Sequence, residues 1–216
     1  MLVAFALAAA FAQESPVDAP RRVRGLANGR LALVRKVISD PELVRAIATR
    51  NRVSTSPADV KRQDEDWQRN PELPLRKEVT TNECATRLKA IVQDDAAISE
   101  AYLMDNRGAI VCSIADVPDY WQGDEPNFQR TFGQGQFLYV GDPSADPSAP
   151  GAWTIPISMV VLDGPTKIGA ATLTLKVTPE MLAPPTDPPP APPLAPPVAP
   201  TVEATPDPTP TPTPVP

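Results

Sequence analysis

Apolar positions recur every three or four residues in the first half of the chain and every two residues in the second half. The first helical stretch is marked by Leu31, Val34, Val37, Ile38, Leu43, Val44 and Ile47. Intervals of three and four place such residues on one side of a helix. The segment Ser39-Asp40-Pro41-Glu42 interrupts the repeat, and we predict that Ser39 and Glu42 form a capping box that starts a second helix.

Two more helices are predicted before the pattern changes. Ser56-Pro57-Ala58-Asp59 has the same order of residue types and predicts a short helix that runs toward Trp67. Farther along, Cys84, Leu88 and Ile91 fall on one side of a third helix, whose apolar face we expect to pack on a sheet.

From residue 97 onward the alternation has a period of two, which is typical of strands. Segments 97–105 and 109–115 flank Asn106-Arg107-Gly108, a strong signal for a hairpin. Three further strands are predicted over 135–142, 152–163 and 166–177, the last two joined at Asp163-Gly164-Pro165. Helices followed by an antiparallel sheet of about five strands predict an α+β fold.

Composition confines this fold to the middle of the chain. Residues 1–12, MLVAFALAAAFA, carry no side-chain charge and end in Ala-Phe-Ala, which predicts a signal peptide and a periplasmic or secreted protein. These residues are too few for a transmembrane helix, which needs about 20, and no later segment is suited to one. Of the 30 prolines, 16 lie in residues 183–216, so we expect a disordered, extended, proline-rich tail there.

Charged residues are distributed unevenly along this middle part of the chain. Residues 21–62 hold 11 Lys and Arg against 3 acids, whereas residues 63–182 hold 9 against 18. We interpret the basic helices as solvated or docked against the acidic remainder of the chain; binding of anionic lipid is the alternative. No aromatic residue is interleaved with these basic residues, which argues against a nucleic-acid partner.

The two cysteines, Cys84 and Cys112, have two interpretations. In an oxidising compartment they could form a disulfide that closes a loop of about 28 residues. Otherwise they are two separate buried thiols that pack as small apolar groups. With two cysteines and no histidine, the chain lacks the ligands of an ordinary zinc site, and we predict no metal and no cofactor.

The stretch DYWQGDEPNF, residues 119–128, carries the candidate chemistry. It begins a cluster of aromatic residues that comprises Tyr120, Trp121, Phe128, Phe132, Phe137, Tyr139 and Trp153. Such clustering suits a concave, mostly apolar binding site. Asp124 and Glu125 could accept hydrogen bonds from an ammonium group, and Arg107 or Arg130 could hold a carboxylate. The alternative is that Tyr120 and Trp121 fill the core and the carboxylates are solvated.

Catalysis is not indicated by these residues. Adjacent carboxylates such as Asp124 and Glu125 rarely lie across a glycosidic bond, which needs two acids about 5–9 Å apart. The chain has no histidine to act as a general base and no Gly-x-Ser-x-Gly sequence. We therefore expect a protein that is not an enzyme.

Taken together, AYLMDNRGAIVCSIADVPDYWQGDEPNFQRTF, GQFLYVGDPSAD and TIPISMVVLDGPTKIGAATLTLKV resemble the extracellular PAS-like sensor domains called Cache domains. The resemblance spans roughly residues 23–182, and the run Tyr120-Trp121-Gln122-Gly123-Asp124-Glu125 is its most specific part. It implies a long N-terminal helix, a five-stranded antiparallel sheet and a small-ligand pocket between the sheet and its covering loops. Tyr120, Trp121, Asp124, Glu125, Arg130, Tyr139 and Arg107 are then the candidate ligand contacts.

This resemblance gives an expected domain organisation. We expect a signal peptide over 1–12, a linker over 13–22, a helical stalk over 23–76, a sensor domain over 77–182 and the tail over 183–216. The sequence departs from the family at Pro126 and Asn127, where a basic, helix-favouring pair is usual. It also has the proline-rich tail where family receptors continue into a second transmembrane helix and a signalling module.

Two functions follow as hypotheses. The first is a sensor-like domain, without its own signalling module, that recognises a small amine, amino acid or organic acid. The second is a structural or interaction protein of the cell envelope that contacts an envelope protein through its polyproline tail and its stalk. In either case the stalk is a candidate surface for a homodimer.

Overall fold

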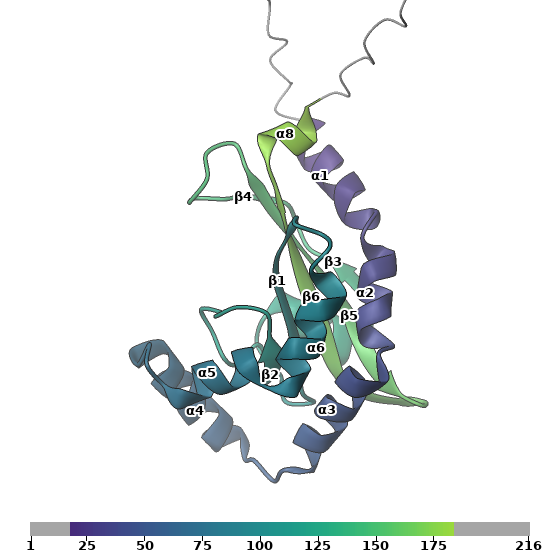
Figure 1. Ribbon diagram of the computed structural model, residues 1–216. Coiled ribbons are helices and arrows are strands. Elements are labelled where there is room, and N and C mark those ends of the chain that lie inside the picture. Colours follow the sequence, from purple (N-terminus) through teal and green to yellow (C-terminus); the bar gives the residue numbers. More distant parts are fainter. Residues whose placement is uncertain (1–17, 184–216) are drawn as a thin grey trace, which may run out of the picture. The chain divides into compact units, whose positions relative to one another are not determined.

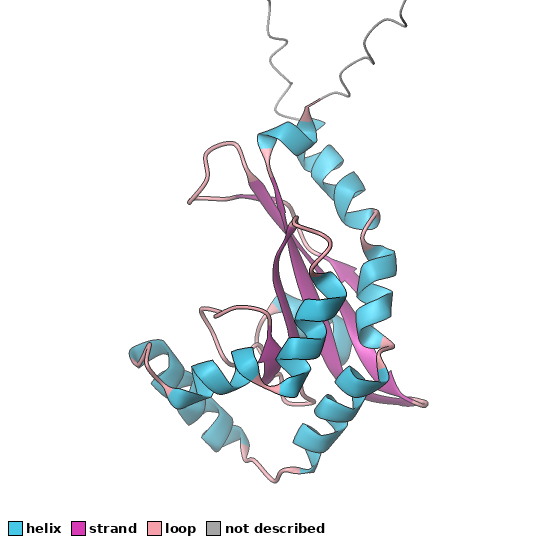
Figure 2. Cartoon of the chain, viewed as in Figure 1, coloured by secondary structure: helices cyan, strands magenta, loops and turns pink. Residues whose placement is uncertain are grey.

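The computed structural model describes residues 18–183, which belong to one compact unit. The predicted signal peptide, the first part of the predicted linker and the proline-rich tail from residue 184 onward lie outside the described residues. Within the described range, helices pack against an antiparallel sheet (Figures 1 and 2). The predicted α+β fold is confirmed.

Six helices precede the sheet in the described range, and short helical turns follow later. The helices are α1 (Asp18–Asn28), α2 (Leu31–Ile38), α3 (Pro41–Arg52), α4 (Pro57–Arg69), α5 (Pro74–Thr81), α6 (Glu83–Val92), α7 (Pro126–Phe128) and α8 (Pro179–Leu182), with the π-helical turn η1 (Gln129–Gly133) after α7. None of the described helices is both long enough and apolar enough to cross a membrane.

The sheet has the strand order β2-β1-β6-β5-β3, and β4 pairs with β5 beyond the end of β3. Its strands are β1 (Ile98–Met104), β2 (Ile110–Ser113), β3 (Leu138–Val140), β4 (Ser144–Ala145), β5 (Trp153–Asp163) and β6 (Thr166–Val177). Every pairing is antiparallel, so the predicted hairpins β1–β2 and β5–β6 are both present. The long connection between β2 and β3, residues 116–134, is here called the crossover.

The two faces of the sheet bury two separate apolar clusters, because side chains alternate along a strand. Ala101 and Leu103 of β1 contribute to a helix-side core formed with α1, α2, α3 and α6. Tyr102 and Met104 contribute to a crossover-side core formed with α4, α5 and the crossover. The helices of the predicted stalk thus supply part of the helix-side core, and α4 and α5 lie near the β2 end of the sheet (Figure 1).

Two basic residues of the N-terminal helices dock onto acidic residues of the rest of the chain. Arg24 pairs with Asp142, and the Nε of Arg30 lies 3.0 Å from the Oδ2 of Asp95. The expected docking of basic helices against the acidic part is therefore observed for these residues.

The two predicted helix starts have different outcomes. Ser56 and Asp59 form the predicted capping box at the start of α4. The capping box of Ser39 and Glu42 is wrong, because Asp40 is the N-cap of α3 and accepts hydrogen bonds from the backbone N–H groups of Glu42 and Leu43. The hydroxyl of Ser39 instead donates to the carbonyl of Arg35 at the end of α2.

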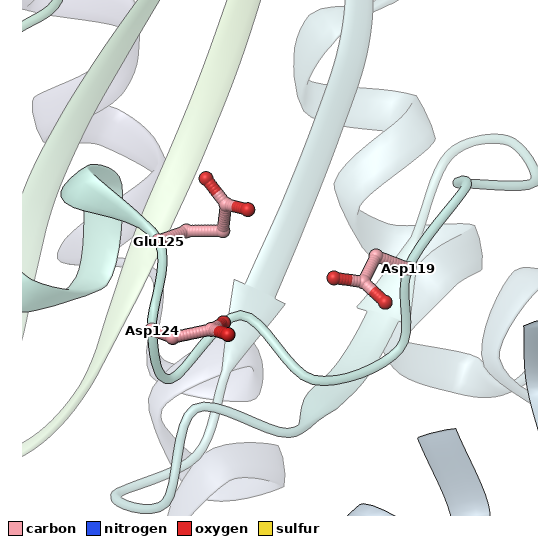
Figure 3. A group of neighbouring side chains, drawn as sticks. All are labelled: Asp119, Asp124 and Glu125. Carbon is pink, nitrogen blue, oxygen red and sulfur yellow. The ribbon is translucent and has the colours of Figure 1, made fainter. Parts of the chain in front are cut away.

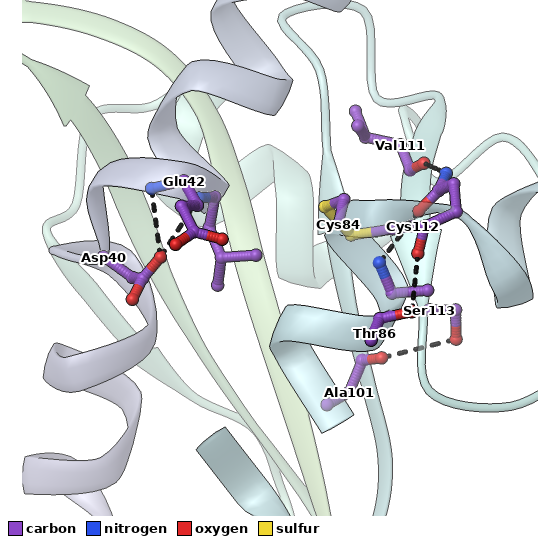
Figure 4. Close-up of a disulfide and its surroundings, with 11 residues drawn as sticks. Asp40, Glu42, Cys84, Thr86, Ala101, Val111, Cys112 and Ser113 are labelled. Carbon is purple, nitrogen blue, oxygen red and sulfur yellow. Dashed lines mark hydrogen bonds between the residues drawn. A yellow bond between two sulfur atoms is a disulfide. The ribbon is translucent and has the colours of Figure 1, made fainter. Parts of the chain in front are cut away.

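Cys84 and Cys112 form a disulfide between α6 and β2 (Figure 4). Both residues are buried in the helix-side core, so the bridge joins a covering helix to an edge strand. Of the two interpretations of these cysteines, the structure has the disulfide.

Candidate functional site

The first part of the crossover doubles back onto the β1–β2 hairpin. The N–H of Ile110 donates to the carbonyl of Tyr120, and the N–H of Gln122 donates to the carbonyl of Gly108 at 2.8 Å. Gly108 has a φ of +84°, and a Cβ at this position would lie 2.5 Å from the Cα of Gly123. The two glycines therefore let the hairpin and the DYWQGDE stretch touch backbone to backbone.

Tyr120 lies in the core and not at the lip of a pocket. Its side chain is 1% exposed, and its ring centroid is 5.5 Å from that of Trp67. The hydroxyl accepts a hydrogen bond from the Nη2 of Arg50 at 3.0 Å. Burial raises the pKa of Tyr120, although Arg50 acts in the opposite direction. The side chain of this predicted ligand contact therefore packs as part of the core, with its hydroxyl bonded to Arg50.

Trp121, the next residue, is only partly buried and packs over Gly123. Its Nε1 donates to the carbonyl of Arg107 at 2.8 Å, which fixes the orientation of the indole. The Nζ of Lys61 lies 5.3 Å from the ring centroid, within the range of a cation–π contact. The indole face thus already has an ammonium group above it.

Three carboxylates of the crossover converge on one another. Asp119, Asp124 and Glu125 each offer an oxygen, and these oxygens lie within 4.8 Å of one another (Figure 3). We call these three residues the acidic turn. In the described range, none of them forms an ion pair with a lysine or arginine. Burial, followed by the charges of Asp124 and Asp119, raises the pKa of Glu125.

A fourth carboxylate comes from α4. The Oδ1 of Asp64 accepts hydrogen bonds from the N–H groups of Tyr120 (3.1 Å) and Trp121 (3.0 Å), and Gln68 donates to both Asp64 and Asp119. Burial, together with the neighbouring Asp119, raises the pKa of Asp64 to about 6. Sequence reasoning missed Asp64 because it lies far from the crossover in the chain.

Replacing Asp64 by asparagine should stabilise the protein more at pH 7 than at pH 4. The folded state binds the Asp64 proton more tightly than the unfolded state does, because the pKa is raised to about 6. The contribution of this proton to the free energy of unfolding is fully present below the ordinary pKa of an aspartate and is lost as the pH rises through 6. Asparagine keeps an oxygen that can accept both N–H bonds and carries no charge at either pH.

Urea unfolding of both proteins at pH 4 and pH 7 measures this effect. The control is Asp163→Asn at the exposed end of β5, whose effect should not depend on pH in the same way. A stability difference between Asp64→Asn and the unmodified protein that is equal at both pH values contradicts the raised pKa.

Buried polar groups lie beneath the acidic turn, on the crossover side of the sheet. The hydroxyl of Tyr102 donates to the Oε1 of Gln122 at 3.1 Å, and Asn127 donates to the same hydroxyl. Burial raises the pKa of Tyr102 to about 12. On the adjacent strands, the hydroxyls of Ser158 and Thr172 lie 2.8 Å apart. These residues supply a polar floor that sequence reasoning did not identify, although Gln122 stands inside the quoted stretch.

The remaining predicted contacts do not bond to the acidic turn. Arg107 pairs with Asp105 and donates to the carbonyl of Val53. Arg130 is exposed on η1, where it contacts Gln134. Tyr139 is half-buried on the edge strand β3. Of the predicted contacts, the structure thus brings together Asp124 and Glu125, and it adds Asp119, which the sequence analysis had not singled out as a ligand contact.

No protein-family model and no curated protein matches this sequence. Solved structures that match include the ligand-binding domain of the Pseudomonas aeruginosa PAO1 amino acid chemoreceptor PctC in complex with GABA, with 16% identity and a TM-score of 0.40, over 73% of this chain and 56% of that chain. The Vibrio cholerae histidine kinase DctB sensor domain matches with 14% identity and a TM-score of 0.40, over 74% and 52%.

A third match is the ligand-binding domain of the Campylobacter jejuni chemoreceptor Tlp3 in complex with L-norvaline, with 15% identity, a TM-score of 0.34 and coverage of 75% and 62%. The chain spans little more than half of the length of the solved structures that it matches. These three solved structures are one sensor domain and two ligand-binding domains.

Proposed function

We propose that this protein is an extracytoplasmic ligand-binding domain whose acidic turn binds the protonated amine of a small organic molecule. The observation that carries the proposal is the convergence of Asp119, Asp124 and Glu125 within 4.8 Å, without an ion pair to any described lysine or arginine. A bound ammonium group would relieve the mutual repulsion of these carboxylates and donate charge-assisted hydrogen bonds to them.

The surroundings of the acidic turn favour an organic amine. Trp121, in the same stretch of the crossover, has a half-buried indole whose contact with Lys61 is of the kind that an ammonium ligand would make. Gln122 and Tyr102 supply hydrogen-bonding groups behind them. A site with acidic, aromatic and neutral polar groups suits a small amine or an amino acid better than an organic acid.

The disulfide supports the placement outside the cytoplasm. Disulfides persist in oxidising compartments and are rare where thiols are kept reduced. The Cys84–Cys112 bridge therefore accords with the periplasmic or secreted location that residues 1–12 indicate. Binding without catalysis completes the proposed function.

Small amines should raise the melting temperature of the protein, and the double variant Asp124→Asn/Glu125→Gln should abolish this rise. The measurement is a thermal-shift screen with putrescine, ethanolamine and γ-aminobutyrate, with calcium chloride as a test for a metal ion in the same place. Each neutral amide keeps the size of its side chain and removes the negative charge that attracts the ammonium group.

The matched control is Asp163→Asn, which removes an exposed carboxylate outside the site and should leave the rise unchanged. The proposal is contradicted if no amine shifts the melting temperature, if calcium alone does so, or if the double variant responds as the unmodified protein does.

A further inference from the structure

A second recess lies on the helix side of the molecule, apart from the acidic turn. It has a volume of about 760 Å³ and lies between α3 on one side and the junction of α5 and α6, with β2, on the other. Glu42 and the Cys84–Cys112 disulfide lie on opposite sides of it (Figure 4). We call it the α3 groove. Its volume is within the range of ligand-binding cavities.

The two walls of the α3 groove carry groups of opposite charge. Arg45 and Arg50 project from α3, together with Glu42 in the first turn of that helix. Glu78 of α5 and Glu83 of α6 stand on the other wall. Among the described residues, no ion pair within 4.0 Å joins the arginines of one wall to the glutamates of the other. The arginines and the glutamates are therefore not paired with each other across the width of the groove.

Contacts at both ends of α3 hold the walls of the groove in place. At the start of α3, the buried carboxylate of Asp40 pairs with Arg87 of α6 at 2.6 Å. Near its end, Arg50 donates to the hydroxyl of Tyr120 in the crossover. These contacts within the protein fix α3 against α6 and the crossover, so an occupant would not need to order α3, which favours binding.

The floor between the charged walls is mainly apolar and its polar groups are already bonded. Ala46, Val53, Val111 and the disulfide line it, and Val53 is 48% exposed. The Oδ1 of Asn82 accepts from the N–H of Ala85, and its Nδ2 donates to the carbonyl of Val111. An occupant would therefore make mainly apolar contacts with the floor and few hydrogen bonds.

We propose that the α3 groove binds a short peptide with free termini. The peptide carboxylate pairs with the arginines of α3, its ammonium group pairs with Glu78 and Glu83, and its body covers the apolar floor. A single amino acid would fill only a fraction of the groove, whereas a peptide of a few residues spans the separated charges. This site is independent of the acidic turn and of the amine proposed there.

The test uses a pool of random tetrapeptides with free termini and a second pool with acetylated and amidated termini. Each pool is passed over the immobilised full-length protein, and retained peptides are identified by mass spectrometry. Retained sequences are resynthesised and titrated by calorimetry. We expect the free-termini form of a retained peptide to bind at least about tenfold more tightly than its doubly blocked form, since two charged contacts are lost on blocking.

Variants assign the contacts to individual walls. Arg45→Gln and Glu83→Gln change exposed side chains of the groove and are expected to fold. Arg45→Gln should lower the affinity for the peptide with a free carboxylate about tenfold. It should leave the affinity for the C-terminal amide unchanged, because the amide has no carboxylate to pair with Arg45. Glu83→Gln should behave in the same way toward the acetylated peptide. Arg35→Gln, an exposed change on α2 outside the groove, is the matched control.

Three results would overturn the proposal: no retained peptide in either pool, equal retention of both pools, or affinities that Arg45→Gln and Glu83→Gln leave unchanged. The variant Asp124→Asn/Glu125→Gln should retain peptide binding while it loses the response to amines. The failure of one site can therefore be distinguished from the failure of the other.

Discussion

Replacing Trp67 by alanine should lower the free energy of unfolding by about 3–5 kcal/mol, as expected for loss of a large buried ring. Trp67 is fully buried in the crossover-side core, where its ring packs against Tyr120 at a centroid distance of 5.5 Å. Arg76 of α5 has its guanidinium carbon 4.4 Å from the centroid of the Trp67 ring. The indole Nε1 donates to the carbonyl of Val117 at 2.9 Å. The substitution removes all of these contacts at once.

Urea unfolding followed by circular dichroism measures this loss. Trp67→Phe is the matched variant, because it keeps an aromatic ring in the cavity and loses the hydrogen bond to Val117. It should be less destabilising than the alanine variant. A cost below about 1 kcal/mol for Trp67→Ala, the range of most surface changes, would mean that α4 is not anchored through this residue.

Reduction of the Cys84–Cys112 disulfide should cost about 3–4 kcal/mol of stability. The bridge spans a sequence separation of 28 residues, and the chain-entropy model gives about this value for a loop of that length. Both cysteines are buried, so the freed thiols would also have to pack without the bond. The measurement is the urea midpoint of the protein with and without a strong reductant.

The double variant Cys84→Ala/Cys112→Ala separates loss of the bridge from other effects of the reductant. Its stability should match that of the reduced protein approximately and should not change when reductant is added. If the reductant leaves the unmodified protein as stable as before, the disulfide does not contribute to the folded state in solution.

The outline of the fold could be predicted because each element has its own periodicity. Alternation between residues 152 and 177 and the turn at Gly164 predicted the β5–β6 hairpin, in which Gly164 has a φ of +57°. The error at Ser39 has a specific cause. A proline that begins a helix makes the residue directly before it the N-cap, which is Asp40 before Pro41 and Ser56 before Pro57. The predicted N-cap, Ser39, thus lies one residue too early, and α3 has Asp40 as its N-cap without a capping box.

The candidate site could be predicted only in part, since its residues come from distant segments. Tyr120 and Trp121 are adjacent in an extended segment, and neighbouring side chains there point to opposite sides. The sequence does not reveal which of them is buried; the structure buries Tyr120 and leaves Trp121 half-exposed. Asp64 and Tyr102 reach the site from α4 and β1, and no local pattern connects them to the crossover.

The separation of the apolar residues into two clusters has a consequence for how the molecule opens. The crossover-side core is the smaller one, and α4, α5 and the crossover depend on it, whereas α1, α2, α3 and α6 depend on the other face of the sheet. The smaller layer can therefore unfold locally while the larger layer stays native, as contiguous cooperative units do in other proteins. The opening free energy measured by amide hydrogen exchange should then be lower for α4 than for β6. A ligand bound at the acidic turn would first raise the opening free energy of this smaller layer.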